Sequence, residues 1–152
     1  MRNILLLTIL TLVGCTYHAA YTAFQPVQMD SWVHKDELKF EIDAVCPPGE
    51  YALNICVRTT EAKRLNTQRI PLKVTQTWEH LTDTLIDTLV ITLTDKHGRS
   101  SGKGINHHDI ITRFTTFEMP DTLRGTITIA PQATDTIHGL THVGLEITAI
   151  EK

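Results

Sequence analysis

Threonine alternating with isoleucine, leucine and valine is the feature that most constrains how this chain folds. Threonine supplies 24 of the 152 residues, and most of these lie in short runs where polar and aliphatic residues take turns. A period of two places one kind of residue on each face of a β-strand, and β-branched side chains suit half-exposed strand positions. Alanine-rich and Glu/Lys-rich helical stretches are missing from the sequence. The pattern therefore predicts an all-β fold.

The predicted strands follow one another at short spacing. The most apolar run, residues 85–94, predicts a central strand, and Pro47-Pro48-Gly49 predicts a hairpin turn between the first two strands. Seven or eight short strands with no helical period between them predict a two-sheet antiparallel β-sandwich of jelly-roll type. The clearest strands are expected at 38–44, 51–57, 70–78, 85–94, 110–119, 123–130 and 143–149.

The N-terminal segment has the form of a lipoprotein signal peptide. Arg2 is followed by an apolar and threonine-containing run that ends in Leu12-Val13-Gly14-Cys15. In such peptides the cysteine thiol is acylated, for example with palmitate, and the cysteine becomes the new N-terminus. About ten apolar residues fall short of the roughly 20 that a spanning helix needs. We therefore predict a signal peptide at residues 1–14 and lipidation of Cys15.

The remaining chain is about 138 residues long and suits one domain. Residues 15–35 have no clear period and are interpreted as the lipidated N-terminus followed by a tether or edge segment. Aromatic residues in that segment, among them Phe24 and Trp32, are expected to cover one edge of the core. Residues 36–152 are predicted to form a single β-sandwich domain.

The charge balance argues against nucleic acid as a partner. Loss of Arg2 leaves 13 basic residues against 17 acidic ones, a net charge of −4. A basic patch is the usual electrostatic footprint of a nucleic-acid-binding protein, and no run of like charge occurs here. The scattered charges indicate a mixed-charge, solvated surface.

Cys46 and Cys56 remain after Cys15 is assigned to the lipid. A disulfide requires Cα atoms within roughly 7 Å and converging side chains. In a regular hairpin about Pro47-Pro48-Gly49 the two cysteines would lie several pairs apart and on different faces. We therefore expect free thiols, although an envelope compartment permits disulfides.

No residue set supports a named reaction. The three serines are Ser31, Ser100 and Ser101, and none stands in a nucleophile-elbow pattern. Metal sites need three or four converging ligands, and the histidine groups at 107–108 and 138–142 lie in expected loops and turns. We expect no enzyme activity, no cofactor and no metal site.

A partner surface is expected on the loop at residues 97–109. Loops held by a rigid scaffold disproportionately carry binding function. The candidate contact residues are His97, Arg99, Lys103, His107 and His108.

The chain also resembles the gliding-motility lipoprotein GldH family over nearly its whole length. The residues that carry the resemblance are 87–93, Asp95, Gly98, Gly102, Gly104 and 139–147 in the second half, with Cys15, Trp32, Leu38, Phe40 and 51–58 in the first. The resemblance implies an outer-membrane lipoprotein that supports motility and associated secretion in gliding bacteria and is not an enzyme. Residues 16–20 lack the acidic cluster of surface-exported lipoproteins, which implies a domain facing the periplasm.

Two functions from different classes remain at this stage. The first is a lipid-anchored, non-catalytic scaffold or accessory component that contacts the membrane through Cys15 and binds other envelope proteins. The alternative is a glycan-binding β-sandwich module on the cell envelope. Exposure of Trp32 or Trp78 would favour the glycan module, because exposed aromatic faces stack on sugars, whereas burial of both would favour the scaffold.

Overall fold

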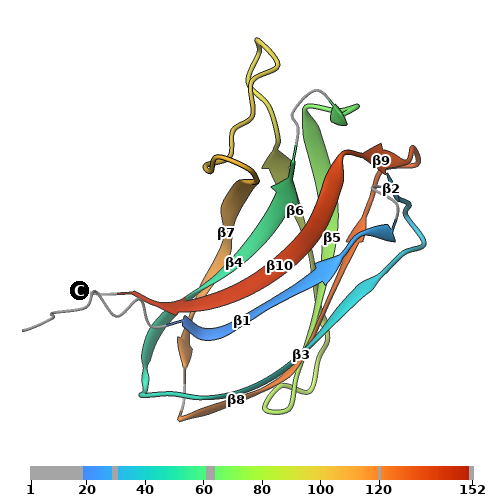
Figure 1. Ribbon diagram of the computed structural model, residues 1–152. Coiled ribbons are helices and arrows are strands. Elements are labelled where there is room, and N and C mark those ends of the chain that lie inside the picture. The colour runs from blue at the N-terminus through green and yellow to red at the C-terminus, as the bar shows by residue number, and fades with distance from the viewer. Residues whose placement is uncertain (1–18, 29–30, 61–63, 120, 151–152) are drawn as a thin grey trace, which may run out of the picture.

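The computed structural model describes residues 19–28, 31–60, 64–119 and 121–150 (Figure 1). Cys15 and the predicted signal peptide lie outside the described residues. In the part of the chain that is described, every regular element is a β-strand. The strands are β1 (Ala19–Pro26), β2 (Ser31–Trp32), β3 (Leu38–Val45), β4 (Gly49–Thr59), β5 (Arg69–Trp78), β6 (Leu85–Thr92), β7 (His108–Met119), β8 (Thr122–Pro131), β9 (Ile137–His138) and β10 (Leu140–Ala149).

The eight long strands form two four-stranded sheets. The first sheet has the order β1-β10-β4-β7, and the second has the order β3-β8-β5-β6. All of their pairings are antiparallel, and the short strands β2 and β9 form a separate antiparallel pair. Figure 1 shows the two sheets facing each other as the layers of a sandwich. The prediction of an all-β, two-sheet antiparallel sandwich is confirmed.

The core lies between the sheets and follows the predicted alternation. In β3, Phe40, Ile42 and Ala44 are buried while the residues between them are exposed. The first sheet contributes Leu53 and Ile55 of β4 to the same buried cluster. Full burial of an aliphatic or aromatic side chain stabilises the fold by about 1.5–3 kcal/mol. Burial of apolar side chains between the two sheets therefore holds them together.

The turn at Pro47-Pro48-Gly49 does not form the predicted hairpin. β3 pairs with β8 in the second sheet, whereas β4 pairs with β10 and β7 in the first, so the turn carries the chain from one sheet to the other. The Tyr51 hydroxyl donates a 2.8 Å hydrogen bond to the carbonyl oxygen of Pro47 and closes the turn. The prediction was wrong because two amphipathic strands show the same pattern whether they pair or face each other across a core.

β6 is an edge strand, contrary to the predicted central position. It pairs with β5 alone, and Leu85, Ile86 and Val90 are 44%, 67% and 52% exposed. The run enters the core toward its end, where Leu89 is partly buried and Ile91 and Leu93 are fully buried. Apolar content misled the prediction because the position of a strand in its sheet depends on its pairing partners.

The segment without a clear period contributes a strand to the sandwich. β1 pairs with β10 at one edge of the first sheet, and Phe24 remains 37% exposed there. Trp32 in β2 is 1% exposed, and its indole N–H donates a 2.7 Å hydrogen bond to the carbonyl oxygen of Asp36. An edge strand buries only part of each face, which explains why the sequence of β1 does not alternate clearly.

Both described cysteines are free thiols, as the strand geometry suggested. Cys46 lies against Met119, with its thiol directed at the thioether sulfur. Cys56 is buried in β4, where desolvation raises the pKa of its thiol to about 12. Since the thiolate is the reactive form, Cys56 is inert near neutral pH.

Candidate functional site

The described chain starts at one end of the sandwich, and a long loop leaves from the other end. Ala19 pairs with Thr148 near the end of β10, and the neighbouring Ala149 pairs with Tyr51 near the start of β4. At the far end of β4, Thr59 pairs with His108, the residue that follows the loop. The eight residue steps from Tyr51 to Thr59 separate the two ends by roughly 26 Å.

We call residues 93–107 the projecting loop. In Figure 1 this loop rises beyond the ends of β6 and β7, on the side opposite the start of β1. It contains most of the residues that the sequence suggested for a partner surface. Its conformation therefore decides what the molecule presents at this end.

The tip of the projecting loop is a turn organised by Asp95. One carboxylate oxygen accepts hydrogen bonds from the backbone N–H groups of His97 and Arg99, at 2.8 and 2.9 Å. The other oxygen accepts a 3.2 Å bond from the Arg99 guanidinium. The Arg99 amide above all, together with the His97 amide and the Arg99 charge, holds the pKa of the Asp95 carboxyl below its usual range. The turn is therefore fixed by an ionised carboxylate.

Backbone bonds and two glycines complete the loop. Lys103 and Asp109 exchange both backbone hydrogen bonds, at 3.1 and 3.0 Å. Gly98 and Gly104 have φ values of 74° and 138°, which side chains rarely adopt. A Cβ atom at Gly104 would overlap the carbonyl oxygen of His107, whereas the same addition at Gly98 would meet nothing. The loop thus has a defined fold, most tightly constrained near Gly104.

An ion pair holds the base of the loop to the first sheet. Arg58 in β4 donates from Nε and Nη2 to the two carboxylate oxygens of Asp109, at 2.6 and 2.7 Å. This pairing lowers the pKa of the Asp109 carboxyl. The Arg58 guanidinium also lies 4.8 Å from the centre of the Phe24 ring, a cation–π geometry. Sequence analysis did not identify this pair, because 51 residues separate its members and strand order cannot be deduced from alternation.

The structure places the five predicted contact residues in or directly after the projecting loop. His97, Arg99, Lys103 and His107 are exposed, whereas His108 is half-buried as the first residue of β7. His97 and Arg99 share the Asp95 turn, and Lys103 lies nearer the base, opposite Asp109. The loop therefore offers several exposed cations and imidazoles.

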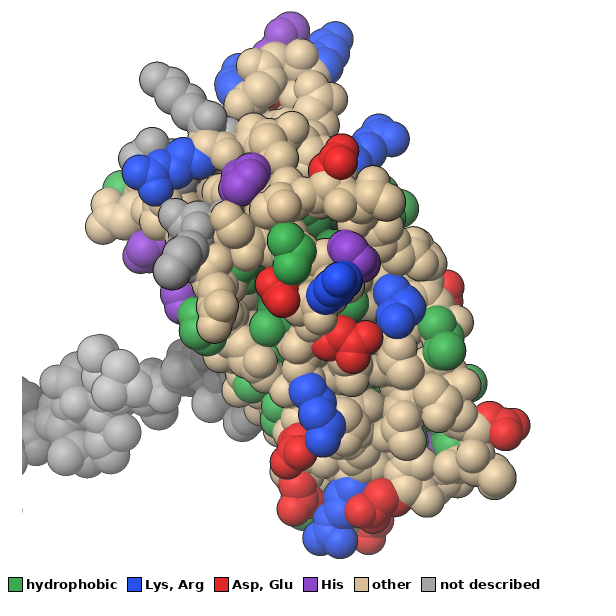
Figure 2. Space-filling model, turned by 90° about the vertical axis from the view of Figure 1, so that its right-hand side faces the viewer, with side chains coloured by type: hydrophobic (Ala, Val, Ile, Leu, Met, Phe, Trp, Pro, Cys, Tyr) green, Lys and Arg blue, Asp and Glu red, His purple; other side chains and the backbone are tan. Residues whose placement is uncertain are grey.

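The face of the molecule seen in Figure 2 has a different character. Basic and acidic side chains are intermixed over it, and hydrophobic side chains lie scattered in small groups. On the outer side of the second sheet, side chains of opposite charge form exposed pairs, Lys39 with Glu41 and Arg124 with Asp43. Such pairs contribute little to stability and are typical of solvated surfaces.

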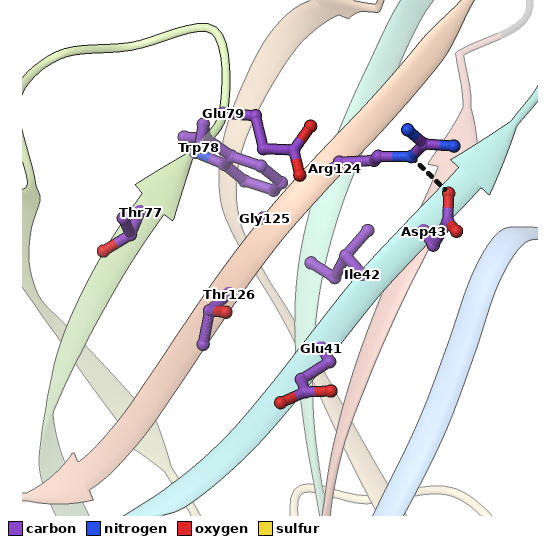
Figure 3. A pocket seen from close by; sticks show the side chains of 9 residues that line it. All are labelled: Glu41, Ile42, Asp43, Thr77, Trp78, Glu79, Arg124, Gly125 and Thr126. Atoms are coloured by element: carbon purple, nitrogen blue, oxygen red, sulfur yellow. Dashed lines mark hydrogen bonds and ion pairs between the residues drawn. The ribbon is translucent and has the colours of Figure 1, made fainter.

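A shallow pocket of about 410 Å³ lies on the outer side of the second sheet (Figure 3). Arg124 donates a 3.0 Å hydrogen bond to Asp43 there, and Glu41 and Glu79 add negative charge. Trp78 contributes to the lining but is only 6% exposed. With Trp32 also buried, neither tryptophan offers a face on which a sugar could stack, which favours the scaffold over the glycan module.

Metal ligands do not gather in the residues that the structure describes. No group of three or more His, Cys, Asp or Glu side chains there could hold a metal ion. Nor does any helix among the described residues have the length and hydropathy needed to cross a membrane.

Comparison with known families decides the classification. The family model described as GldH lipoprotein matches residues 19–147, which is most of the chain. The chain belongs to the GldH lipoprotein family. It is therefore a lipoprotein of the gliding-motility type, lipid-anchored and associated with a membrane. Cys15 lies just before the matched residues.

No curated protein matches the chain. Among solved structures, the Eiger TNF from S. frugiperda matches with 9% sequence identity and a TM-score of 0.35, covering 69% of this chain. The match spans 62% of that structure's length.

Proposed function

We propose that this GldH-family lipoprotein is a non-catalytic scaffold or accessory subunit of a gliding-motility machine or its associated secretion machinery. An acylated Cys15 holds it on the outer membrane, and the sandwich lies in the periplasm. The projecting loop binds another protein of the cell envelope.

The separation of the two ends of the sandwich carries this proposal. Ala19, the first described residue, lies only four residues after Cys15, so the start of β1 belongs to the membrane side. The projecting loop lies at the opposite end, roughly 26 Å further along β4. An anchor at one end and a structured loop at the other suit a protein that presents a binding surface away from the membrane.

The chemistry of the loop also suits binding. Asp95 and the Arg58–Asp109 pair fix the loop through charge-assisted hydrogen bonds, which leaves the side chains of His97, Lys103 and their neighbours exposed. Preorganisation of this kind lowers the conformational entropy lost on association. The exposed cations favour an acidic surface on the partner.

The periplasmic orientation rests on residues 16–20, which carry no acidic side chain. Protease treatment of intact cells tests it. We expect the protein to survive shaving and to be digested once the outer membrane is permeabilised. Removal from intact cells would place the domain on the outside.

A crosslinked pull-down of the tagged, lipidated protein from native envelopes tests the scaffold function. We expect one envelope protein in stoichiometric amount, identified by mass spectrometry. A variant with His97→Ala, Arg99→Ala and Lys103→Ala should lose it. The matched control, Lys39→Ala with Lys73→Ala on the outer face of the second sheet, should retain it. If nothing is enriched above an unrelated lipoprotein, the scaffold proposal fails.

A further inference from the structure

The end of the sandwich where β1 starts contains a second pocket, of about 600 Å³. The start of β1, the turn between β3 and β4, and the end of β10 enclose it. Most of its lining is apolar, with Val45, Pro47, Pro48 and Ile150 among the contributors. Neither the projecting loop nor the Arg58–Asp109 pair lies here, so the surface is separate from the proposed partner site.

The turn that borders this pocket is an exposed apolar tip. Val45 is 77% exposed, whereas Ile42 of β3 and Leu53 and Ile55 of β4 are buried. Pro47 and Pro48 beside it are also exposed. The Tyr51 hydroxyl bond to Pro47 holds the turn in place. A fixed apolar tip next to an apolar pocket is unusual for a surface that faces only water.

The short stretch of chain between Cys15 and Ala19 limits what can lie against this tip. Ala19 lies four residue steps after Cys15, and Ala19 itself lines the pocket. Even a fully extended chain of four residues spans only about 14 Å. If Cys15 carries acyl chains in a bilayer, the surface of that bilayer must lie within this distance of the pocket.

We propose that this end of the sandwich rests on the membrane that holds the Cys15 anchor, with Val45, Pro47 and Pro48 in contact with lipid. The inference rests on the proposed acylation of Cys15 and adds a second, non-covalent contact to it. This contact fixes how the domain stands on the membrane. It thereby directs the projecting loop away from the bilayer.

The charges at this end determine which lipids suit the contact. Glu50 lines the pocket, Glu118 is its cross-strand partner, and the backbone of Asp121 accepts a hydrogen bond from Cys46. The turn at residues 45–49 carries no basic residue. Lipid contact is therefore apolar and is expected with uncharged headgroups, with no gain from anionic lipid.

Quenching by brominated lipid tests the contact directly. The full chain is produced with its signal peptide, purified in its lipidated form and placed in phosphatidylcholine vesicles with brominated acyl chains. The probe is Val45→Trp, and the matched control is Ile105→Trp in the projecting loop, where Ile105 is 97% exposed. Emission is compared with that of the parent protein, whose two tryptophans are buried. We expect loss of the added emission for Val45→Trp and none for Ile105→Trp.

Flotation of the same vesicles separates failure of the contact from failure of the anchor. If the protein floats but neither Val45→Trp nor the second probe Pro47→Trp is quenched, the anchor stands and the proposed contact is overturned. Equal quenching of the Ile105→Trp control also overturns it, because the domain would then have no fixed orientation. A protein with an intact Cys15 that fails to float overturns both proposals. Quenching that grows with added anionic lipid contradicts an apolar contact.

Discussion

The two ends of this sandwich are stabilised by different physical means. At the start of β1, burial dominates: Tyr51 is 5% exposed, and the Cys46 thiol packs against Met119. At the other end, two ionised carboxylates, Asp95 and Asp109, organise the projecting loop. Protons and salt therefore act directly on the fold of the projecting loop, whereas the packing of Tyr51 and Met119 at the anchor end involves no ionised group. One end of the fold is thus held by apolar packing, and the other by hydrogen bonds to ionised carboxylates.

The largest effect is expected from Cys15→Ala. Each acyl methylene buried in a bilayer contributes about 0.8 kcal/mol, so loss of the acylated cysteine removes most of the membrane affinity. The protein should move from the membrane fraction to the soluble fraction, as measured by fractionation and immunoblotting. Cys46→Ala is the control and should stay with the membrane. A Cys15→Ala protein that remains bound would show that the base of the sandwich holds the domain without the lipid.

The next effect comes from the loop glycines. Gly104→Ala should destabilise the loop by about 2–3 kcal/mol, because its Cβ would overlap the His107 carbonyl oxygen. Gly98→Ala should cost only about 1 kcal/mol, since it meets no atom and is strained by its φ of 74° alone. Hydrogen exchange at the amides of Lys103 and Asp109 measures the loss of loop stability in each variant. Equal effects of the two substitutions would contradict the constrained geometry at Gly104.

Loss of the ion pair at the loop base should have a smaller effect. Asp109→Asn is expected to lower the free energy of unfolding by about 1 kcal/mol at pH 7, as measured by urea denaturation. The hydrogen bonds from Arg58 lower the pKa of the folded Asp109 carboxyl. The pair therefore stabilises the protein above the unfolded pKa of about 4, and this contribution is lost as the pH falls through the lower folded value.

The pH series supplies its own control. The difference in the free energy of unfolding between the parent and Asp109→Asn should shrink on acidification. A difference that stays constant down to pH 2 would show that packing, and not charge, accounts for the effect.

The smallest effect on global stability is expected from Asp95→Ala. The Asp95 side chain is 41% exposed and lies in the loop, outside the core, so its loss should loosen the tip of the loop without unfolding the sandwich. Faster proteolysis between residues 95 and 101 is the expected result, with an unchanged thermal midpoint. Because its folded pKa is lowered, the parent should show the same loosening as the pH falls through that value. Asp95→Asn keeps one oxygen acceptor, so its rate of proteolysis should lie between those of the parent and of Asp95→Ala. A clear fall in the thermal midpoint of Asp95→Ala would contradict a role confined to the loop.

The sequence predicted what depends on local pattern and missed what depends on pairing. Alternation along β3 correctly indicated the buried face of Phe40 and Ile42, and the Asp-to-Gly turn at residues 95–98 correctly indicated a loop. Alternation could not show that β3 and β4 belong to different sheets. For the same reason it could not show that Arg58 meets Asp109, since that contact exists only after β4 and β7 pair.

Site-specific photocrosslinking in intact cells tests the central claim, that the projecting loop is the partner surface of an anchored scaffold. A photoreactive phenylalanine analogue replaces Ile105 in the loop or, as a control, Ile86 of β6, which is 67% exposed. Ile86 lies at the start of β6, far along the strand from the loop. We expect one discrete protein adduct at position 105 and none of that mass at position 86. No adduct at Ile105, or the same adduct at both positions, would contradict it.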